Sequence, residues 1–237
     1  MERKCCILIT LLVLILLPCV EALAMDTGFS TEMMPEDMQE NVIDYMDITM
    51  LDEAPKSKII SCFDVNENGL IAIGSNTMLE QIISVYSADG EFLYGYEFEL
   101  DGMFGVEWDE DLIIIYTVCG DSAIAVDKTG KIVEILDIID TPESDEYWDT
   151  VFSTRRVVGQ DKYTIRNDMG ILNLFLSSYS QLLKTDVNGE TTIIYDVNTF
   201  HLIKTIFIVL AIIIFVGIVT TLVVMNLVKV LSNKTSN

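Results

Sequence analysis

Carboxylate and amide side chains occupy alternate positions in one short segment of the chain. Asp64, Asn66 and Asn68 are followed by Gly69, and oxygen ligands at this spacing bind Ca²⁺ in the first half of a calcium loop. The twelfth position of such a loop is Ser75, where a glutamate would bind through both oxygens. Strand-forming residues flank the segment, so a hairpin turn is the competing interpretation of this candidate metal site.

A second acidic group surrounds a tryptophan. The flanking acids of Trp108 are Glu107, Asp109, Glu110 and Asp111. Two carboxyls of unequal pKa hydrolyse glycosides, and an indole face can receive a sugar ring. Such clusters also arise by chance in a chain with 37 acidic residues. We therefore predict no catalytic residue, no enzyme activity and no cofactor.

Histidine-dependent catalysis lacks its base in this sequence. The only histidine, His201, directly precedes an apolar C-terminal run. A Ser-His-Asp or Cys-His mechanism within the preceding domain is therefore not expected.

A basic pair stands out in an otherwise acidic region. Arg155 and Arg156 follow an acidic, aromatic stretch that contains Trp148. They form either an internal salt-bridged loop or a docking site for an acidic group. With Trp108 and Trp148, they make up the predicted ligand or partner surface.

The cysteines allow one disulfide in the exported chain. Cys62 and Cys119 are the two that remain after the N-terminal leader is removed. Export permits a bridge, but sequence does not show whether the two Cα atoms come within bonding distance. A Cys62–Cys119 bridge is therefore a possibility that the structure must decide.

These residues lie between two apolar ends, of which the first resembles a signal peptide. Arg3 and Lys4 precede an uncharged run, and Ala22 and Ala24 form an A-x-A cleavage site. We predict a signal peptide over residues 1–24, with Met25 as the first residue after cleavage. The alternative is an uncleaved anchor, but the run is short against the ~20 residues that a spanning helix needs.

The second apolar end predicts a transmembrane helix over residues 205–228. No charged residue occurs between Thr205 and Met225, and this stretch is about 31 Å long as a helix, which matches a hydrocarbon core. Lys229 and Lys234 follow without an acid. We therefore predict a cytoplasmic tail over residues 229–237 and a single-pass protein of the plasma membrane, with its N-terminal domain extracytoplasmic.

The chain is strongly acidic, with a formal net charge of −23. Such a surface repels nucleic acid and favours cations or basic partners. The alternative is that the charge only keeps the domain soluble. Nucleic acid is excluded as a partner in either case.

The segment over residues 25–57 is acidic and rich in methionine. Pro35, followed by two acids, suits a helix start, and Met38, Val42, Tyr45 and Met46 would then share a face. We expect either a short amphipathic helix that covers a sheet edge or a flexible linker.

Residues 58–200 predict a β-repeat domain. Short β-branched and aromatic runs alternate with turns in three cycles of four strands, and the second hairpin of each cycle turns at Gly90, Gly130 or Gly189. Units of about 40 to 50 residues with four strands are typical of propeller blades.

Three stretches carry a resemblance to a known family of repeats: residues 63–69, 84–90 and 125–130. They resemble β-propeller repeats of the NHL and quinoprotein type, as in uncharacterised Gram-positive single-pass membrane proteins. Closed propellers have about four to eight blades, and this chain offers three. The expected fold is therefore mainly β, with antiparallel four-stranded blade-like repeats in a partial or open propeller, plus one C-terminal transmembrane helix. A second chain or the N-terminal segment would close the ring, and a plain meander or sandwich is the competitor.

The function that follows is presentation of a binding surface. We expect a membrane-anchored extracytoplasmic binding or sensing module that recognises a protein or an envelope component. One alternative is a structural subunit of a membrane complex, possible also as a homo-oligomer, with Gly217 and Thr221 on a helix-packing face. The other is a carboxylate-dependent hydrolase built around Trp108.

Overall fold

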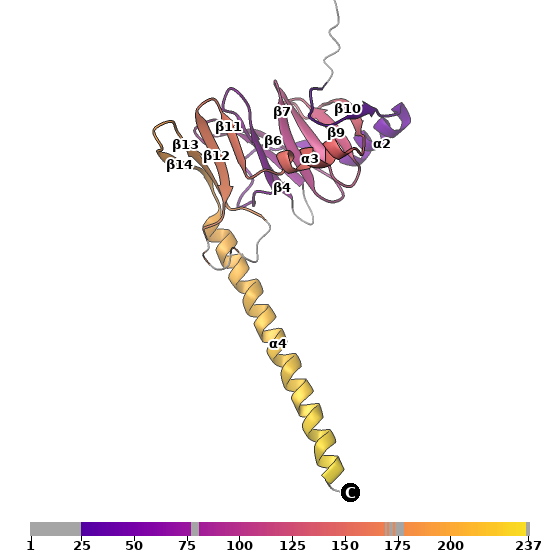
Figure 1. Ribbon diagram of the computed structural model, residues 1–237, viewed down its shortest axis with the longest axis vertical. Helices are drawn as coiled ribbons and strands as arrows, with labels where there is room; N and C mark the ends of the chain where they lie inside the picture. The colour runs from indigo at the N-terminus through magenta and orange to yellow at the C-terminus, as the bar shows by residue number, and fades with distance from the viewer. Residues whose placement is uncertain (1–24, 77–80, 169, 171–172, 174–177, 236–237) are drawn as a thin grey trace, which may run out of the picture.

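The protein is mainly β, with three antiparallel sheets and one long C-terminal helix (Figure 1). The computed structural model describes residues 25–76, 81–168, 170, 173 and 178–235. The predicted signal peptide, residues 1–24, lies outside the described residues.

Each predicted cycle of four strands forms one sheet. The central sheet has the order β2-β6-β5-β4-β3, with β2 (Thr49–Met50), β3 (Cys62–Val65), β4 (Ile71–Asn76), β5 (Gln81–Tyr86) and β6 (Phe92–Phe98). The helix-covered sheet has the order β1-β10-β9-β8-β7, with β1 (Thr31–Met33), β7 (Phe104–Asp109), β8 (Leu112–Thr117), β9 (Ser122–Val126) and β10 (Ile132–Ile138). The C-terminal sheet has the order β11-β12-β13-β14, with β11 (Arg155–Val158), β12 (Asp161–Arg166), β13 (Gln181–Thr185) and β14 (Thr191–Asp196).

Side-chain caps and left-handed glycines make the hairpins tight. In the β9–β10 turn, Asp127 Oδ1 accepts hydrogen bonds from the backbone N–H of Thr129 and Lys131, at 2.8 and 3.1 Å. Gly130 in that turn has φ +83°, which a residue with a Cβ rarely adopts. Asp186 caps the β13–β14 turn in the same way. The D/N-G signals in the sequence therefore identify these turns correctly.

The central sheet is buried on both faces because its strands are apolar at nearly every position. On one face, Ala72 and Ile83 pack with Phe104 and Ile124 of the helix-covered sheet. On the other face, its side chains pack against the C-terminal sheet in a cluster that contains Phe63, Ile71, Ile73, Tyr163 and Leu182. The three sheets therefore stack face to face, with the first in sequence at the centre.

The order of the sheets in space differs from their order in sequence. Successive propeller blades would place the third sheet against the second, but here the third packs on the first. Helix α3 (Pro142–Val151) explains the difference, since it follows β10 at one edge of the helix-covered sheet and crosses the outer face of that sheet towards β7. Thr141 caps its N-terminus by accepting a hydrogen bond from the N–H of Ser144.

The N-terminal segment is structured and adds to two sheets. Helix α2 (Glu36–Met46) begins directly after Pro35, so the predicted helix is confirmed. Only part of its predicted face is buried, because Met46 is 1% exposed while Met38 and Tyr45 are 49% and 46% exposed. The strands β1 and β2 on either side of α2 pair with the edge strands β10 and β6.

Helix α4 (Asn198–Thr235) contains the predicted span and continues on both sides of it. Residues Asn198–Met225 are long and apolar enough to cross a membrane, with a mean hydropathy of 3.2. Figure 1 shows α4 projecting away from the sheets, and its apolar side chains are exposed there. A single-pass membrane protein fits this helix.

Candidate functional site

Three residues, one from each sheet, meet where the first strands of the sheets converge. Asp64 on β3 accepts a hydrogen bond from Arg156 Nε on β11 at 2.7 Å and from the backbone N–H of Trp108 on β7 at 2.8 Å. The side chains of Arg156 and Asp64 are only 12% and 14% exposed. This junction (Asp64, Trp108 and Arg156) therefore fixes the three strands relative to one another.

The remaining donors of Arg156 also bind inside the protein. Nη2 donates to the carbonyl of Val151 at 3.0 Å, and Nη1 donates to the carbonyl of Arg155 at 3.1 Å. Its guanidinium lies 5.5 Å from the centroid of the Phe63 ring. Arg156 therefore forms an internal salt bridge and is not a docking site for an acidic group. Arg155, whose side chain points to the other face of the strand, is exposed.

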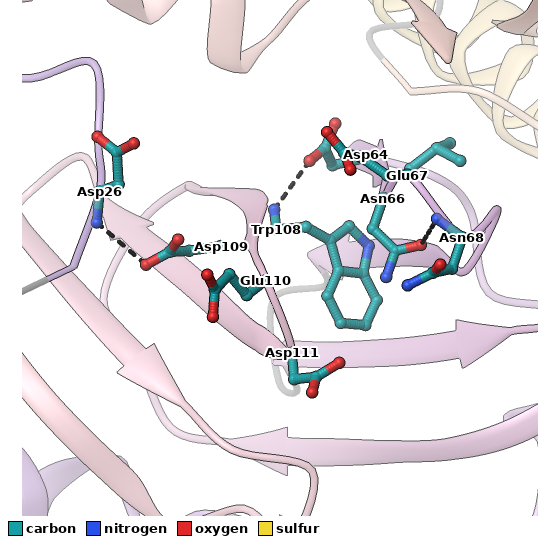
Figure 2. Close-up of a pocket in the computed structure, with 10 residues that line it drawn as sticks. Asp26, Asp64, Asn66, Glu67, Asn68, Trp108, Asp109, Glu110 and Asp111 are labelled. Carbon is teal, nitrogen blue, oxygen red and sulfur yellow. Dashed lines mark hydrogen bonds between the residues drawn. The ribbon is translucent and has the colours of Figure 1, made fainter. Parts of the chain in front are cut away.

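A pocket of about 550 Å³ opens beside the junction, where the β3–β4 and β7–β8 turns lie next to each other (Figure 2). Its lining consists of Asp26, Asp64, Val65, Asn66, Glu67, Asn68, Trp108, Asp109, Glu110 and Asp111. Six of these ten residues are carboxylic acids, and none is basic. Among the six, Asp64 has its charge paired by Arg156. The pocket is consequently a region of strong negative potential.

The pocket lies at the ends of the strands that are farther from α4. An isolated bridge joins Ile60 to Tyr179, so the starts of β3 and β13 share one edge. Gln181 at the start of β13 pairs with Asp196 at the end of β14, and α4 begins directly after β14. The β3–β4 turn, which lines the pocket, therefore lies at the opposite end of the strands. Figure 1 shows α4 leaving the sheets at the end where β14 finishes.

The predicted calcium-loop segment is the turn of the β3–β4 hairpin. Asn66 Oδ1 accepts hydrogen bonds from the backbone N–H of Asn68 and Leu70 at 3.0 and 2.9 Å, and Gly69 has φ +80°. Both oxygens of Asp64 are used within the junction. The described residues include no group of three or more His, Cys, Asp or Glu side chains that could hold a metal ion. The geometry supports the turn interpretation.

Two buried hydrogen-bond donors in the pocket lining have no partner among the residues that the structure describes. They are Asn66 Nδ2 and Trp108 Nε1, and Asn66 is only 7% exposed. Figure 2 shows both side chains in the lining. A buried donor without an acceptor costs about 1–3 kcal/mol, which a ligand with acceptor atoms would recover. The pocket thus combines free negative charge with unsatisfied N–H groups.

Glu107 does not belong to this pocket. Neighbouring residues on a strand point to opposite faces, so Glu107 faces α3 while Trp108 faces the junction. Its carboxylate accepts hydrogen bonds from the hydroxyls of Tyr116 at 2.8 Å and Tyr147 at 2.9 Å. Burial raises the pKa of Glu107, and the two hydroxyls partly oppose that rise. The carboxylate pair that a hydrolase would need is therefore not assembled from Glu107 and its neighbours.

Trp148 also lies away from the pocket. It packs on α3 against Phe29 and stacks on Phe152, with ring centroids 4.7 and 5.8 Å apart. The predicted partner surface of Trp108, Trp148, Arg155 and Arg156 is thus not a single surface, and only Trp108 lines the pocket.

The Cys62–Cys119 disulfide that the sequence left open is not formed, since both cysteines are free. Cys62 points into the core between the central and helix-covered sheets, whereas Cys119 is exposed after β8. Burial raises the pKa of the Cys62 thiol to about 12, so it stays protonated and unreactive.

Sequence reasoning missed three members of the pocket, Asp26, Val65 and Glu67, and the ion pair of Asp64. The signal that could have found them is the position of the turns in the repeat. The first hairpin turns of two consecutive cycles lie at the same end of the strands when their sheets pack together. No protein-family model matches the chain, and no curated protein matches it. The geometry is therefore the basis for the function.

The junction predicts a large cost for losing one partner of its ion pair. Asp64→Asn leaves Arg156 as an uncompensated, nearly buried charge, so we expect the free energy of unfolding to fall by about 3–5 kcal/mol. Asp161→Asn is the matched control, because Asp161 pairs with Lys184 at 2.8 Å in a more exposed position, 32% and 25% exposed. This control should lose no more than about 1 kcal/mol. Equal losses of unfolding free energy in a urea titration would show that the junction stabilises the fold no more than an exposed ion pair does.

The raised pKa of Glu107 predicts a pH-dependent stability difference. Because the pKa is higher in the fold than in the unfolded chain, the contribution of Glu107 is full below its ordinary value of 4.5 and is lost as the pH rises through the folded pKa. Glu107→Gln removes this titration. The unfolding free energy of the wild type should therefore fall relative to Glu107→Gln between pH 4 and pH 8, measured by urea titration at each pH. A difference that does not change with pH would contradict the assignment.

Proposed function

We propose that this protein is a membrane-anchored extracytoplasmic binding module whose acidic pocket binds a cationic ligand that also carries hydrogen-bond acceptors. A lysine- or arginine-containing peptide segment of a protein or envelope component has both properties. The observation that carries the proposal is the pocket lining, which joins six carboxylic acids to two unpartnered N–H donors.

Electrostatics favours a cation at this place. Asp109, Glu110 and Asp111 stand together at the β7–β8 turn, and Glu67 faces them from the β3–β4 turn. A cleft lined by one sign of charge raises the local concentration of oppositely charged ligands and their association rate. The net charge of −23 adds attraction over longer distances at low salt.

The donors and the indole add selectivity beyond charge. Backbone carbonyls of a peptide can accept from Asn66 Nδ2 and Trp108 Nε1 after small side-chain movements. The Trp108 ring offers an aromatic face to a guanidinium or ammonium group. A simple inorganic cation would satisfy the carboxylates but not the N–H groups.

The architecture supports presentation of this pocket to the outside. The pocket lies at the edge of the sheets opposite to α4, so an anchored domain would direct it away from the bilayer. We also infer that each sheet is a blade-like unit, since each contains a four-stranded meander whose first strand lies near the junction. In this proposal each sheet resembles a single propeller blade, whereas the three sheets together do not form a propeller ring.

Removing the pocket charges should weaken binding of a basic peptide. We expect the triple variant Asp109→Asn, Glu110→Gln, Asp111→Asn to bind a lysine-rich peptide about tenfold more weakly or worse, measured by calorimetry on the full chain in neutral-lipid nanodiscs. The matched control is Glu143→Gln, Asp145→Asn, Glu146→Gln on α3, which removes the same charge from exposed positions. Equal weakening by both triple variants would show only non-specific attraction to an acidic protein.

The exposed thiol tests the orientation. Cys119 is exposed, and Cys62 is buried and protonated, so a membrane-impermeant maleimide added to intact cells should label Cys119 if the domain is extracytoplasmic. Labelling should disappear in Cys119→Ser, measured by peptide mass spectrometry. Labelling of Cys119 only after the cells are lysed would contradict the proposed orientation.

A further inference from the structure

The first described residues of the chain are seated firmly in the fold. Met25 is 7% exposed and Phe29 is 5% exposed, and both belong to the cluster between α3 and the helix-covered sheet. Thr27 Oγ1 lies 2.7 Å from the hydroxyl of Tyr116. The residue that would follow the predicted cleavage site is therefore packed into this cluster.

The backbone nitrogen of Met25 donates to a carboxylate. The distance from Met25 N to Glu134 Oε2 is 2.7 Å, across 109 residues of sequence. Asp26 N donates in turn to Asp109 Oδ2 at 3.0 Å. Two consecutive backbone nitrogens thus end on side-chain carboxylates rather than on a strand partner.

A strand irregularity positions Glu134 for this contact. The β9–β10 register shifts between Ile132 and Glu134, which leaves Val133 as an extra residue that is 50% exposed. A bulge of this kind redirects the side chains that follow it. Glu134 is placed opposite Ala125, which belongs to the same cluster as Met25.

We propose that the chain is cut on the amino side of Met25 and that the new α-ammonium group of Met25 forms an ion pair with Glu134. A membrane peptidase of the export machinery and one water molecule would hydrolyse the Ala24–Met25 bond. The water oxygen joins the carbonyl carbon of Ala24, which leaves as a carboxylate, and the nitrogen of Met25 leaves as an amine that takes up a proton.

The geometry of the contact suits an ammonium group. A distance of 2.7 Å lies in the range of charge-assisted N⁺–H···O⁻ bonds. An ammonium group has two further hydrogens where an amide has none to spare, and it would place a positive charge next to the Glu134 carboxylate. Asp26, the next residue, lines the pocket. The inference does not depend on what the pocket binds.

Two measurements on the full chain purified from its native membrane test this proposal. Mass spectrometry of the N-terminal peptide should find Met25 with a free α-amine. With a limiting amount of an acetylating reagent, this amine should react about tenfold faster in Glu134→Gln than in the wild type, a ratio equivalent to about 1.4 kcal/mol. Glu91→Gln, an exposed glutamate in the β5–β6 turn, is the matched control and should leave the rate unchanged.

An N-terminus at any residue other than Met25 would overturn the cleavage site. Equal acetylation rates in the wild type, Glu134→Gln and Glu91→Gln would overturn the ion pair. Neither outcome would touch the binding proposal, which depends on the peptide titration.

Discussion

The ion pair between Arg156 and Asp64 is the interaction on which the rest of the arrangement depends. It joins the first strand of the C-terminal sheet to that of the central sheet, and Asp64 also holds the backbone of Trp108 in the helix-covered sheet. A nearly buried pair adds little net stability over apolar residues, but breaking it is costly. We therefore regard it as a specificity device that selects one stacking order of three similar sheets.

That stacking order has a consequence for function. Because the first strands converge, the turns that follow β3 and β7 come together and enclose the acidic pocket. Acidic turn residues that would be dispersed on separated hairpins are thereby concentrated in one place, against electrostatic repulsion. Arg156 compensates the charge of Asp64, and in our proposal a cationic ligand compensates the other acids. Within the described part of the chain, the same packing leaves the side-chain donors Asn66 Nδ2 and Trp108 Nε1 without acceptors.

Local features of the fold could be predicted from sequence, and long-range ones could not. Strand runs and D/N-G turns follow from residue type and period, so the three sheets and α2 were predictable. The strands β1 and β2 have only three and two residues, too few for a periodic signal. The path of α3 across the helix-covered sheet depends on tertiary packing. This path lets the third sheet pack on the first. For the same reason Arg156 was not assigned to Asp64, 92 residues away. Trp108 was placed in the predicted ligand surface and lines the pocket, whereas its fellow lining residue Asp26 was not singled out.

The indole N–H groups offer the most direct measurement of the central claim that the pocket binds a cationic ligand with acceptor atoms. The chain has two tryptophans, Trp108 in the pocket and Trp148 packed beneath α3, so each provides a reference for the other. In ¹H–¹⁵N spectra of the full chain, with the two peaks assigned by Trp148→Phe, titration with a lysine-rich peptide should shift the Trp108 indole peak saturably and leave that of Trp148 in place. A Trp108 peak that does not move, or moves only together with Trp148, would contradict this account.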